Sequence, residues 1–546
     1  MRRDFSALGA DRFDVLVIGG GIHGAFAAWE AARRGHRVAL VERNDFASGT
    51  SANSLKIAHG GLRYLQRLDI GRMRRSSAER STLIRLAPHL VRPLPFLVGT
   101  RGAGRESRIA YRAALTLNDL ITWDRNRGLP AAVRLPPSRL LGRAECLAWF
   151  PGFDEPSLSG GALWYDGQIR HPERLVMGIV LAAAEAGTTV ANYAEAVELR
   201  SENGRIAGAL VADRLSGSSV VVRARAVINA AGPWADQVGP SPRGSAPRRH
   251  ARAMNLVLRR HVADCAVGFR SRTGAAEDPI NGGHRFLFCC PWRDHTLVGT
   301  SYTLDPGDRR PAAIEEISAL LDEVNHACPA LGLSMDEITF YHWGLVPLKD
   351  GVEPGRWNAL AERSQIVEHT NAGMRGLVTA TGPKLTTARQ VAARAVEVAV
   401  GAAGVESPSR DGALPPGGGE RGEESAETRD SRLSELYGAR SGVVAGVISE
   451  NSGWSEPLGE GAPVRRGEVV YAVRAEMAQR LTDVVFRRTD LGTAGPPTPE
   501  SLEAAARIMG NALGWSPEQR RQEVAAVVAA YAPLPVTAAS AVGRTG

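Results

Sequence analysis

The chain has 546 residues, 44% of them apolar and 23% charged, and a formal net charge of +8, so it is long enough for two to four domains with buried cores. This composition excludes a disordered, collagen-like or coiled-coil protein, and no apolar run reaches the roughly 18 residues of a membrane-spanning helix. Five cysteines without a C-x-x-C pair predict a cytoplasmic protein with neither disulfides nor a bound metal. Residues 1–13 are charged and lack the apolar core of a secretory signal.

The positive charge is concentrated in one segment. Twelve arginines but three acidic residues lie between Arg63 and Arg112, a net charge of +9. Such a segment attracts acidic substrates, nucleic acid or anionic lipid, or it is an ordinary solvated surface. The partner that we consider is an anionic membrane on the inner face of the cell membrane, and we expect no nucleic-acid partner. Residues 72–86 are expected to form a helix with three apolar residues available for shallow insertion: Met73, Leu83 and Leu86.

Apolar runs and helical patterns alternate along the first 400 residues. The chain begins with a βαβ unit, made of a buried strand at 14–18, a helix at 25–34 and a second buried strand at 37–42. The later patterns predict helices at 172–186, 314–326 and 385–400, and strands at 188–190, 220–229, 256–258, 285–289, 296–299 and 376–380. The strands between 256 and 299 are expected to form an antiparallel sheet.

The composition changes near residue 404. Residues 404–432 contain Pro415-Pro-Gly-Gly-Gly419 with scattered glutamates and serines, and they predict a linker. Apolar residues at helical spacing follow at 470–484, and residues 502–513 and 517–531 are also helical in pattern. A small helical domain is therefore expected at the end of the chain.

A glycine pattern, Gly19-x-Gly21-x-x-Gly24, lies between the first strand and the first helix, and Glu42 ends the next strand. Glycines at these positions allow a tight turn and close approach of a pyrophosphate, and the helix N-terminus offers N–H groups to the phosphates. The acid would accept hydrogen bonds from a ribose. The pattern predicts a dinucleotide site, the alternative being a glycine turn without a ligand, and it does not separate NAD from FAD.

Two later turns favour FAD. The strand that ends at Ala230-Ala-Gly232 provides a second glycine turn against the nucleotide. Gly382-Pro-Lys-Leu-Thr-Thr387 lies between a strand and a helix, where a helix N-terminus stabilises the negative charge of reduced flavin.

The segment Ser54-Leu-Lys-Ile-Ala-His-Gly-Gly-Leu-Arg-Tyr64 is the densest polar cluster of the chain. A histidine suits proton abstraction from an alcohol, and an arginine suits a phosphate or a carboxylate. The alternative is a structural loop with charged residues on its surface.

These motifs together resemble the FAD-dependent glycerol-3-phosphate dehydrogenases of the D-amino-acid-oxidase-like flavoproteins. The matching strings are 19–24, 54–64, 382–387, Asn229-Ala-Ala-Gly-Pro-Trp234 and, near the end, Glu468-Val-Val-Tyr-Ala-Val-Arg-Ala-Glu476 with Asp483 and Arg487-Arg-Thr489. The resemblance extends from about residue 13 to 531, and His59-Gly-Gly-Leu-Arg-Tyr64 is its most specific string.

The resemblance implies an α/β fold, α+β overall, with a Rossmann-type FAD-binding domain, a substrate domain on a mixed or antiparallel sheet and a C-terminal helical domain. It places an oxidoreductase region at 1–403, a linker at 404–432 and the helical domain at 433–546. Within the first region the FAD-binding parts are expected at about 13–90, 170–235 and 365–403, and the substrate-domain parts at about 91–169 and 236–364.

The resemblance also implies a reaction, in which sn-glycerol 3-phosphate is oxidised to dihydroxyacetone phosphate, flavin N5 takes the hydride, and electrons pass to a quinone or another acceptor. His59, Arg63 and Lys384 are its implied catalytic residues. The implied substrate contacts are Arg63, Tyr64, Arg363 and Lys384. The implied FAD contacts are Gly19, Gly21, Gly24, Glu42, Arg43, Ser54, Lys56, His59, Gly61, Leu62, Val197, Gly232, Gly382, Lys384, Leu385 and Thr386.

Three positions depart from the family pattern. Val346 stands where the family usually has a substrate arginine, Pro383 replaces a glycine and removes an N–H, and His23 replaces an asparagine. Arg252, His342 and Lys349 are candidates for the missing donor. The departure at Val346 favours a second hypothesis, an FAD enzyme of the same fold that acts on another polyol phosphate, a hydroxy acid or an amine. A flavin-binding protein without turnover is a third.

Overall fold

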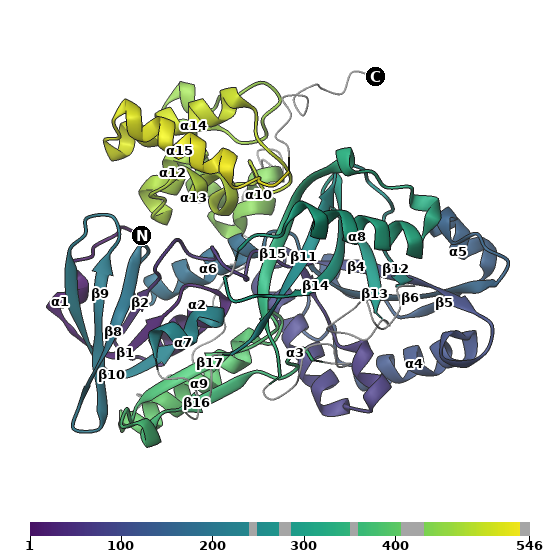
Figure 1. The fold of residues 1–546 in the computed structure, drawn as a ribbon, viewed down its shortest axis with the longest axis horizontal. Coiled ribbons are helices and arrows are strands. Elements are labelled where there is room, and N and C mark those ends of the chain that lie inside the picture. The colour runs from purple at the N-terminus through teal and green to yellow at the C-terminus, as the bar shows by residue number, and fades with distance from the viewer. Residues whose placement is uncertain (240–247, 272–284, 309, 350–358, 406–430, 535–546) are drawn as a thin grey trace. The chain divides into compact units, whose positions relative to one another are not determined.

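The computed structural model describes residues 1–239, 248–271, 285–308, 310–349, 359–405 and 431–534. Contacts divide the chain into two compact units, each made of separate stretches (Figure 1). The first unit comprises Met1–Ala52, His171–Arg249 and Ala361–Gly546, and the second comprises Asn53–Arg170 and His250–Leu360. Residues 53–90, which the sequence analysis assigns to the FAD-binding part, cluster with the second unit. Most of the predicted linker, 406–430, lies outside the described residues.

The first unit contains an eight-stranded sheet with a parallel centre. Its strands run in the order β16-β17-β10-β1-β2-β7, and β10 also pairs with the hairpin β8–β9. Pairing is parallel from β17 to β7, and antiparallel at β16 and in the hairpin. The bounds are β1 Arg12–Ile18, β2 Val38–Val41, β7 Thr189–Ala191, β8 Ala194–Glu202, β9 Arg205–Asp213, β10 Ser219–Asn229, β16 Gln365–Glu368 and β17 Leu377–Thr381.

Helices of the first unit cover one face of this sheet. They are α2 (Ile22–Arg33), α6 (Pro172–Glu185) and α9 (Ala388–Ala403), and the βαβ unit predicted at the start of the chain is therefore confirmed as β1–α2–β2. The opposite face packs against α1 (Ala7–Ala10) and β9 through a core that includes Leu16, Val41 and Val211. A short helix, α7 (Ala235–Val238), follows β10.

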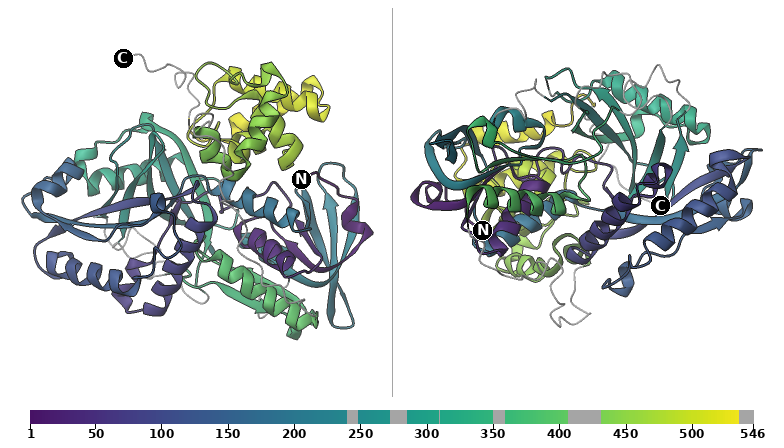
Figure 2. Two further views of the ribbon diagram at one scale, coloured as in Figure 1. Left: turned by 180° about the vertical axis from the view of Figure 1, so that it is seen from behind. Right: turned by 90° about the horizontal axis from the view of Figure 1, so that it is seen from below.

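The C-terminal helices of the first unit pack against one another (Figure 2). Their bounds are α10 Ser431–Tyr437, α11 Ser441–Ser449, α12 Arg466–Glu476, α13 Leu481–Asp483, α14 Pro499–Leu513 and α15 Pro517–Ala529, with a π-helical turn at Val484–Arg488. The single helical pattern predicted across 470–484 is wrong, because Met477 has a left-handed backbone, φ +56°, that ends α12.

The second unit is built on a mixed sheet, as predicted, and this sheet has nine strands. The strand order is β15-β11-β14-β13-β12-β4-β6-β3, with β5 beside β6, and among the described strands β12 and β4 pair in parallel. The bounds are β3 Ile57–Ala58, β4 Val91–Arg101, β5 Arg139–Leu141, β6 Leu158–Ile169, β11 His250–Leu258, β12 Ala266–Arg270, β13 Phe286–Trp292, β14 His295–Leu304 and β15 Ile338–Pro347. Its helices are α3 Ile70–Leu86, α4 Arg108–Ile121, α5 Arg143–Trp149 and α8 Ile314–Ala327.

The predicted helix in the basic segment is present as α3, but its predicted exposed side is wrong. Met73, Leu83 and Leu86 are 0%, 0% and 5% exposed, because the apolar residues of this helix pack into the second unit. They are therefore not available for insertion into a bilayer. Within the described parts of the chain, no helix combines the length and the apolar character needed to cross a membrane.

Candidate functional site

Three turns of the first unit meet where parallel strands end. β1, β10 and β17 are adjacent and parallel, so their carboxyl ends lie at the same edge of the sheet. The turn after β1 contains Gly19–Gly24, the turn after β10 contains Gly232, and the turn after β17 contains Gly382. In open α/β sheets ligands bind at this edge. The fold therefore brings together the three turns that the sequence analysis associates with a nucleotide.

The first glycine turn is shaped by close backbone contacts. Gly19 has φ +108°, and a Cβ on Gly24 would lie 1.8 Å from the Gly19 carbonyl oxygen, so neither position accepts a side chain. Gly21, which caps α2, is different. Among the described residues, the atom that its Cβ would meet is Ser51 Oγ, at 3.1 Å. Ser51 Oγ also accepts the Ile22 N–H at 2.9 Å, so apart from this one hydroxyl the space beside Gly21 is open to a pyrophosphate.

Glu42 follows β2 and faces this turn. Its carboxylate accepts the Gly20 N–H at 2.6 Å through Oε2 and the Asn44 N–H at 2.9 Å through Oε1. Burial raises the pKa of Glu42, and these two backbone hydrogen bonds oppose the rise. A ribose contact of Glu42 stays a prediction. The structure adds that Glu42 holds the glycine turn itself.

The turn after β17 approaches the N-terminus of α2. A Cβ on Gly382 would lie 2.8 Å from His23 Nε2 and 2.5 Å from Ser364 Oγ. His23 Nε2 is buried and has no hydrogen-bond partner among the described residues, and burial lowers the pKa of His23 to about 4. A neutral imidazole nitrogen left without a partner is a group that a bound ligand can satisfy. The open space at Gly21 and this nitrogen fit a dinucleotide cofactor.

The remaining predicted residues of the first unit differ in exposure. The Arg43 guanidinium lies 4.8 Å from the centre of the Trp234 ring. Val197 lies at a bulge of β8 and is 52% exposed. The others are, by increasing exposure, Thr386 (buried), Gly232, Lys384 and Leu385 (half-buried) and Arg363 (exposed). Their roles stay predictions.

In the second unit, Lys56 is fully buried in the segment 54–64. Its ammonium group lies 4.7 Å from the centre of the Trp292 ring, a cation–π contact. The backbone N–H of Lys56 donates to Ser54 Oγ at 3.1 Å, and its backbone carbonyl accepts the Ile169 N–H at 2.7 Å. Lys56 is therefore tied to the end of β6 and to β13.

An ion pair that the sequence analysis missed holds the loop with His59. Arg80 and Asp166 form it at 2.5 Å with side chains 5% and 8% exposed, and Asp166 also accepts the Gly60 N–H at 2.5 Å. The two residues are 86 positions apart, so no local pattern could have revealed the pair. It fixes the backbone next to the candidate base.

The loop leaves His59 and Arg63 accessible. The His59 ring is half-buried, with its centre 6.2 Å from that of the buried Tyr64 ring. Arg63 is exposed, and its guanidinium lies 5.8 Å from the same ring, which Arg72 approaches to 4.5 Å. Leu62 packs into the core of the unit. The loop presents an imidazole and a guanidinium on a rigid support.

Strand register separates the candidates for the donor missing at Val346. Val346 pairs with Ala251, and His342 projects from the same face of β15 because strand side chains alternate. Arg252 projects from the opposite face and donates to Glu316 of α8 at 2.5 Å. His342 Nδ1 lies 3.3 Å from Asn53 Oδ1. Of these two candidates, His342 is the one that shares the face of Val346.

Comparisons with known proteins match nearly the whole chain to FAD-dependent enzymes that act on glycerol phosphate. The family of FAD-dependent oxidoreductases matches residues 14–403, and the C-terminal domain of alpha-glycerophosphate oxidase matches residues 413–520. The glycerol-3-phosphate dehydrogenase of Synechocystis sp. is 30% identical over 96% of this chain and 97% of that protein. Glycerol-3-phosphate dehydrogenase 1 of Mycobacterium bovis is 35% identical over 90% and 94%, respectively.

A solved structure shares the fold. The glycerol-3-phosphate dehydrogenase from Bacillus halodurans, complexed with FAD, matches with a TM-score of 0.74 at 24% identity and covers 98% of this chain and 97% of that chain. The family match spans most of the residues, and the relatives cover nearly the whole length. The chain therefore belongs to the FAD-dependent glycerol-3-phosphate dehydrogenase family and is an FAD-dependent oxidoreductase.

Proposed function

We propose that the chain oxidises the C2 alcohol of sn-glycerol 3-phosphate to the ketone of dihydroxyacetone phosphate. The C2 hydrogen leaves as a hydride and the hydroxyl proton goes to a base, so the substrate loses two electrons and two hydrogens. The turn Gly19–Gly24 would hold FAD, which would supply the hydride acceptor at N5 and a route for the electrons to a quinone or another acceptor. The relatives that carry this activity in their names support the proposal.

The chain's own residues supply the proton and charge chemistry. His59 is the proposed base, because an imidazole nitrogen can accept a hydroxyl proton. Arg63 and Lys384 are proposed to hold the phosphate, since guanidinium and ammonium groups form charge-assisted hydrogen bonds with phosphate oxygens. Tyr64 and Arg363 complete the substrate contacts that the family resemblance implies.

The observation that carries the proposal is the loop of His59 and Arg63, accessible but locked by the Arg80–Asp166 pair. A support of this kind holds the backbone beside His59 in one place, as a positioned catalytic group requires. The test is anaerobic addition of sn-glycerol 3-phosphate to the purified protein while flavin absorbance is followed. Bleaching by this substrate, and not by glycerol, supports the proposal. An unbleached flavin under saturating substrate would contradict it.

Val346 favours one alternative, an FAD enzyme of the same fold that acts on another polyol phosphate, a hydroxy acid or an amine. A family arginine at this position would contribute a charge-assisted hydrogen bond, and valine has no donor. Anaerobic bleaching by another polyol phosphate, a hydroxy acid or an amine, at lower concentration than by glycerol 3-phosphate, would support the alternative.

We also propose that the second unit docks on an anionic membrane, now through α4 and not α3. Ile109, Leu117, Leu120 and Trp123 are 82%, 38%, 66% and 77% exposed, and their spacing places the first three on one side of α4. Large exposed apolar side chains beside a basic surface are typical of interfacial helices. This docking would place the enzyme beside a membrane quinone.

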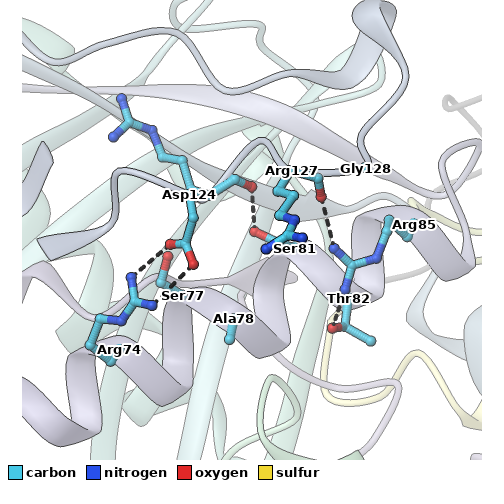
Figure 3. A pocket seen from close by; sticks show the side chains of 10 residues that line it. Arg74, Ser77, Ala78, Ser81, Thr82, Arg85, Asp124, Arg127 and Gly128 are labelled. Carbon is cyan, nitrogen blue, oxygen red and sulfur yellow. Dashed lines mark hydrogen bonds and ion pairs between the residues drawn. The ribbon is translucent and has the colours of Figure 1, made fainter.

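A basic cavity of about 340 Å³ lies between α3 and the loop that follows α4 (Figure 3). Four arginines and three hydroxyl residues line it: Arg74, Arg85, Arg125, Arg127, Ser77, Ser81 and Thr82. Arg74 is paired with Asp124 at 2.6 Å, the acidic residue of the lining (Figure 3). The excess positive charge complements anionic headgroups.

Vesicle sedimentation tests the docking. Vesicles with phosphatidylglycerol should carry the protein down at low salt and not at high salt, because salt screens electrostatic attraction. Leu120→Ser with Trp123→Ser should reduce sedimentation. Val443→Ser is the matched control, since Val443 of α11 is an apolar residue that is 60% exposed and lies outside the second unit. Equal sedimentation of all three proteins would contradict docking through α4.

A further inference from the structure

A buried cluster of six charged side chains joins the C-terminal helices to the nucleotide-binding part of the first unit. Three acids and three arginines form it, so the cluster is neutral in sum. Five of the side chains are at most 4% exposed and the Arg487 side chain is 12% exposed. The members are Asp45, Arg174, Glu476, Asp483, Arg487 and Arg488.

Asp45 and Arg174 are the members that belong to the nucleotide-binding part, and the C-terminal segment contributes two arginines to the Asp45 carboxylate. Arg488 donates to both oxygens at 2.7 Å, and Arg487 Nε donates to Oδ2 at 2.6 Å. Asn192 adds a bond of 3.0 Å and bridges to the Met477 carbonyl at 2.9 Å. Charge-assisted bonds of this kind are the strong ones, so Asp45 has little freedom to move.

The segment 42–47 that contains Asp45 also holds the first glycine turn. The Gly20 N–H donates to Glu42 at 2.6 Å, and the Gly20 carbonyl accepts the Ala47 N–H at 3.0 Å. Both backbone groups of Gly20 are thus bound to this one segment. Phe46 closes it from the side, because a Cβ on Gly20 would lie 2.6 Å from the Phe46 ring. The turn therefore has the conformation that the segment imposes.

We propose that Arg487 and Arg488 are positioning residues for FAD. They hold Asp45, the segment 42–47 holds Gly20, and Gly20 belongs to the turn that receives the pyrophosphate. Binding to a preorganised site avoids the free energy needed to order it. The C-terminal domain thereby controls how long FAD stays bound. The proposal rests on FAD binding and is independent of the substrate that the enzyme oxidises.

Arg487→Gln tests this chain of contacts, because it removes the bond to Asp45, together with the 2.6 Å bond to Asp483, and leaves both Arg488 bonds in place. FAD release from the holoenzyme, followed by flavin fluorescence, is expected to be roughly tenfold faster or more. Hydrogen exchange measured by mass spectrometry should increase in peptides covering 19–24 and 42–47. Arg487→Lys, which keeps the charge, should fall between wild type and Arg487→Gln.

Two controls separate positioning from general loss of stability. Glu523→Gln breaks the Glu523–Arg480 pair of 2.6 Å inside the C-terminal domain, and neither residue contacts segment 42–47 in the described contacts. Glu468→Gln breaks the 2.7 Å pair with Arg432, in which Glu468 is fully buried, and neither residue contacts Asp45, Arg487 or Arg488 in the described contacts. Both controls should release FAD at about the wild-type rate.

The outcomes divide clearly. Faster release in Arg487→Gln with added exchange confined to the two peptides supports the proposal. Wild-type release in Arg487→Gln, or equally fast release in the controls, overturns it. If Arg487→Gln does not fold, Arg487→Lys and the two controls still decide. A wild-type protein that binds FAD but is not bleached by glycerol 3-phosphate would contradict the proposed substrate alone.

Discussion

Loss of the Arg80 side chain is expected to destabilise the second unit strongly, although Arg80 is not part of the proposed catalytic set. The pair that it forms with Asp166 is buried, with side chains 5% and 8% exposed. In Arg80→Met the Asp166 carboxylate stays buried and loses this guanidinium. Breaking one side of a buried ion pair lowers the free energy of unfolding by about 3–5 kcal/mol.

Arg74→Met is the matched control, because Arg74 lies on the same helix, α3, and also pairs with an aspartate. The side chains of Arg74 and Asp124 are 43% and 34% exposed, and exposed pairs contribute about 0–1 kcal/mol. Urea unfolding of the two variants should therefore differ several-fold in the stability lost. Equal losses would refute the reasoning from burial.

A double variant separates stability from the positioning of the loop. Arg80→Met with Asp166→Leu removes both charges, and apolar replacement of a whole buried pair is often neutral or stabilising. The double variant should therefore regain stability relative to Arg80→Met. In the double variant alone the Gly60 N–H also loses its carboxylate acceptor, so anaerobic flavin reduction should be slow although stability recovers. Recovery of both properties would show that Asp166 does not position the loop with His59.

Three further predictions concern the cofactor, the base and acid stability. Gly21→Val should fold but lose bound flavin absorbance, because its side chain would fill the open space in front of α2. His59→Asn should keep FAD and reduce the flavin roughly 10²-fold more slowly in stopped flow, and a wild-type rate would exclude its role as base. Burial raises the pKa of Asp45, but the guanidinium groups of Arg488 and Arg487 outweigh it and set the pKa at about 2, below the ordinary 3.8. The ion pairs of Asp45 with the two arginines therefore stabilise the fold fully above about pH 4 and lose this contribution as the pH falls toward 2. The urea concentration at the unfolding midpoint should fall with acid more steeply in wild type than in Asp45→Asn.

The sequence predicted the elements whose pattern is local. β1, α2 and β2 were within a few residues of their bounds, because strands buried on both faces are continuous apolar runs and glycines end the helix. The Gly19–Gly24 turn was likewise readable, since its function depends on residue type at fixed spacing. Elements that form only by pairing with a segment far away in the sequence could not be predicted. β3 is two residues long, Ile57–Ala58, and exists because it pairs with Gly167 and Gln168 of β6.

The sequence also failed to predict in which direction the side chains of a helix point. The arginine-rich pattern of α3 indicated a solvated helix, yet its apolar residues, and Arg80 itself, point into the second unit. The ion pair of Asp45 with Arg488 joins residues 443 positions apart, so the family string Arg487-Arg-Thr489 gave no sign of which acid Arg488 binds. What single-sequence reasoning lacks here is the packing partner, which decides the side of a helix that is buried.

Val346 allows the substrate assignment itself to be tested. It is half-buried on β15, where it pairs with Ala251. If glycerol 3-phosphate is the substrate and its phosphate lacks a donor, Val346→Arg should tighten the apparent Kd for flavin reduction. One charge-assisted bond is worth about 1.5–3 kcal/mol, or roughly ten- to a hundredfold in binding.

Stopped-flow titrations of wild type and Val346→Arg with glycerol 3-phosphate distinguish the remaining possibilities. If the natural substrate is different, the arginine adds a half-buried charge without a partner, and activity on that substrate should fall because burying such a charge is unfavourable. If wild type already saturates at micromolar concentration, another group has replaced the missing donor. His342, which projects from the same face of β15, is then the first to test, and His342→Gln should weaken binding in wild type but not in Val346→Arg. A Val346→Arg variant with unchanged affinity, together with an unaffected His342→Gln, would show that this face of β15 does not meet the substrate.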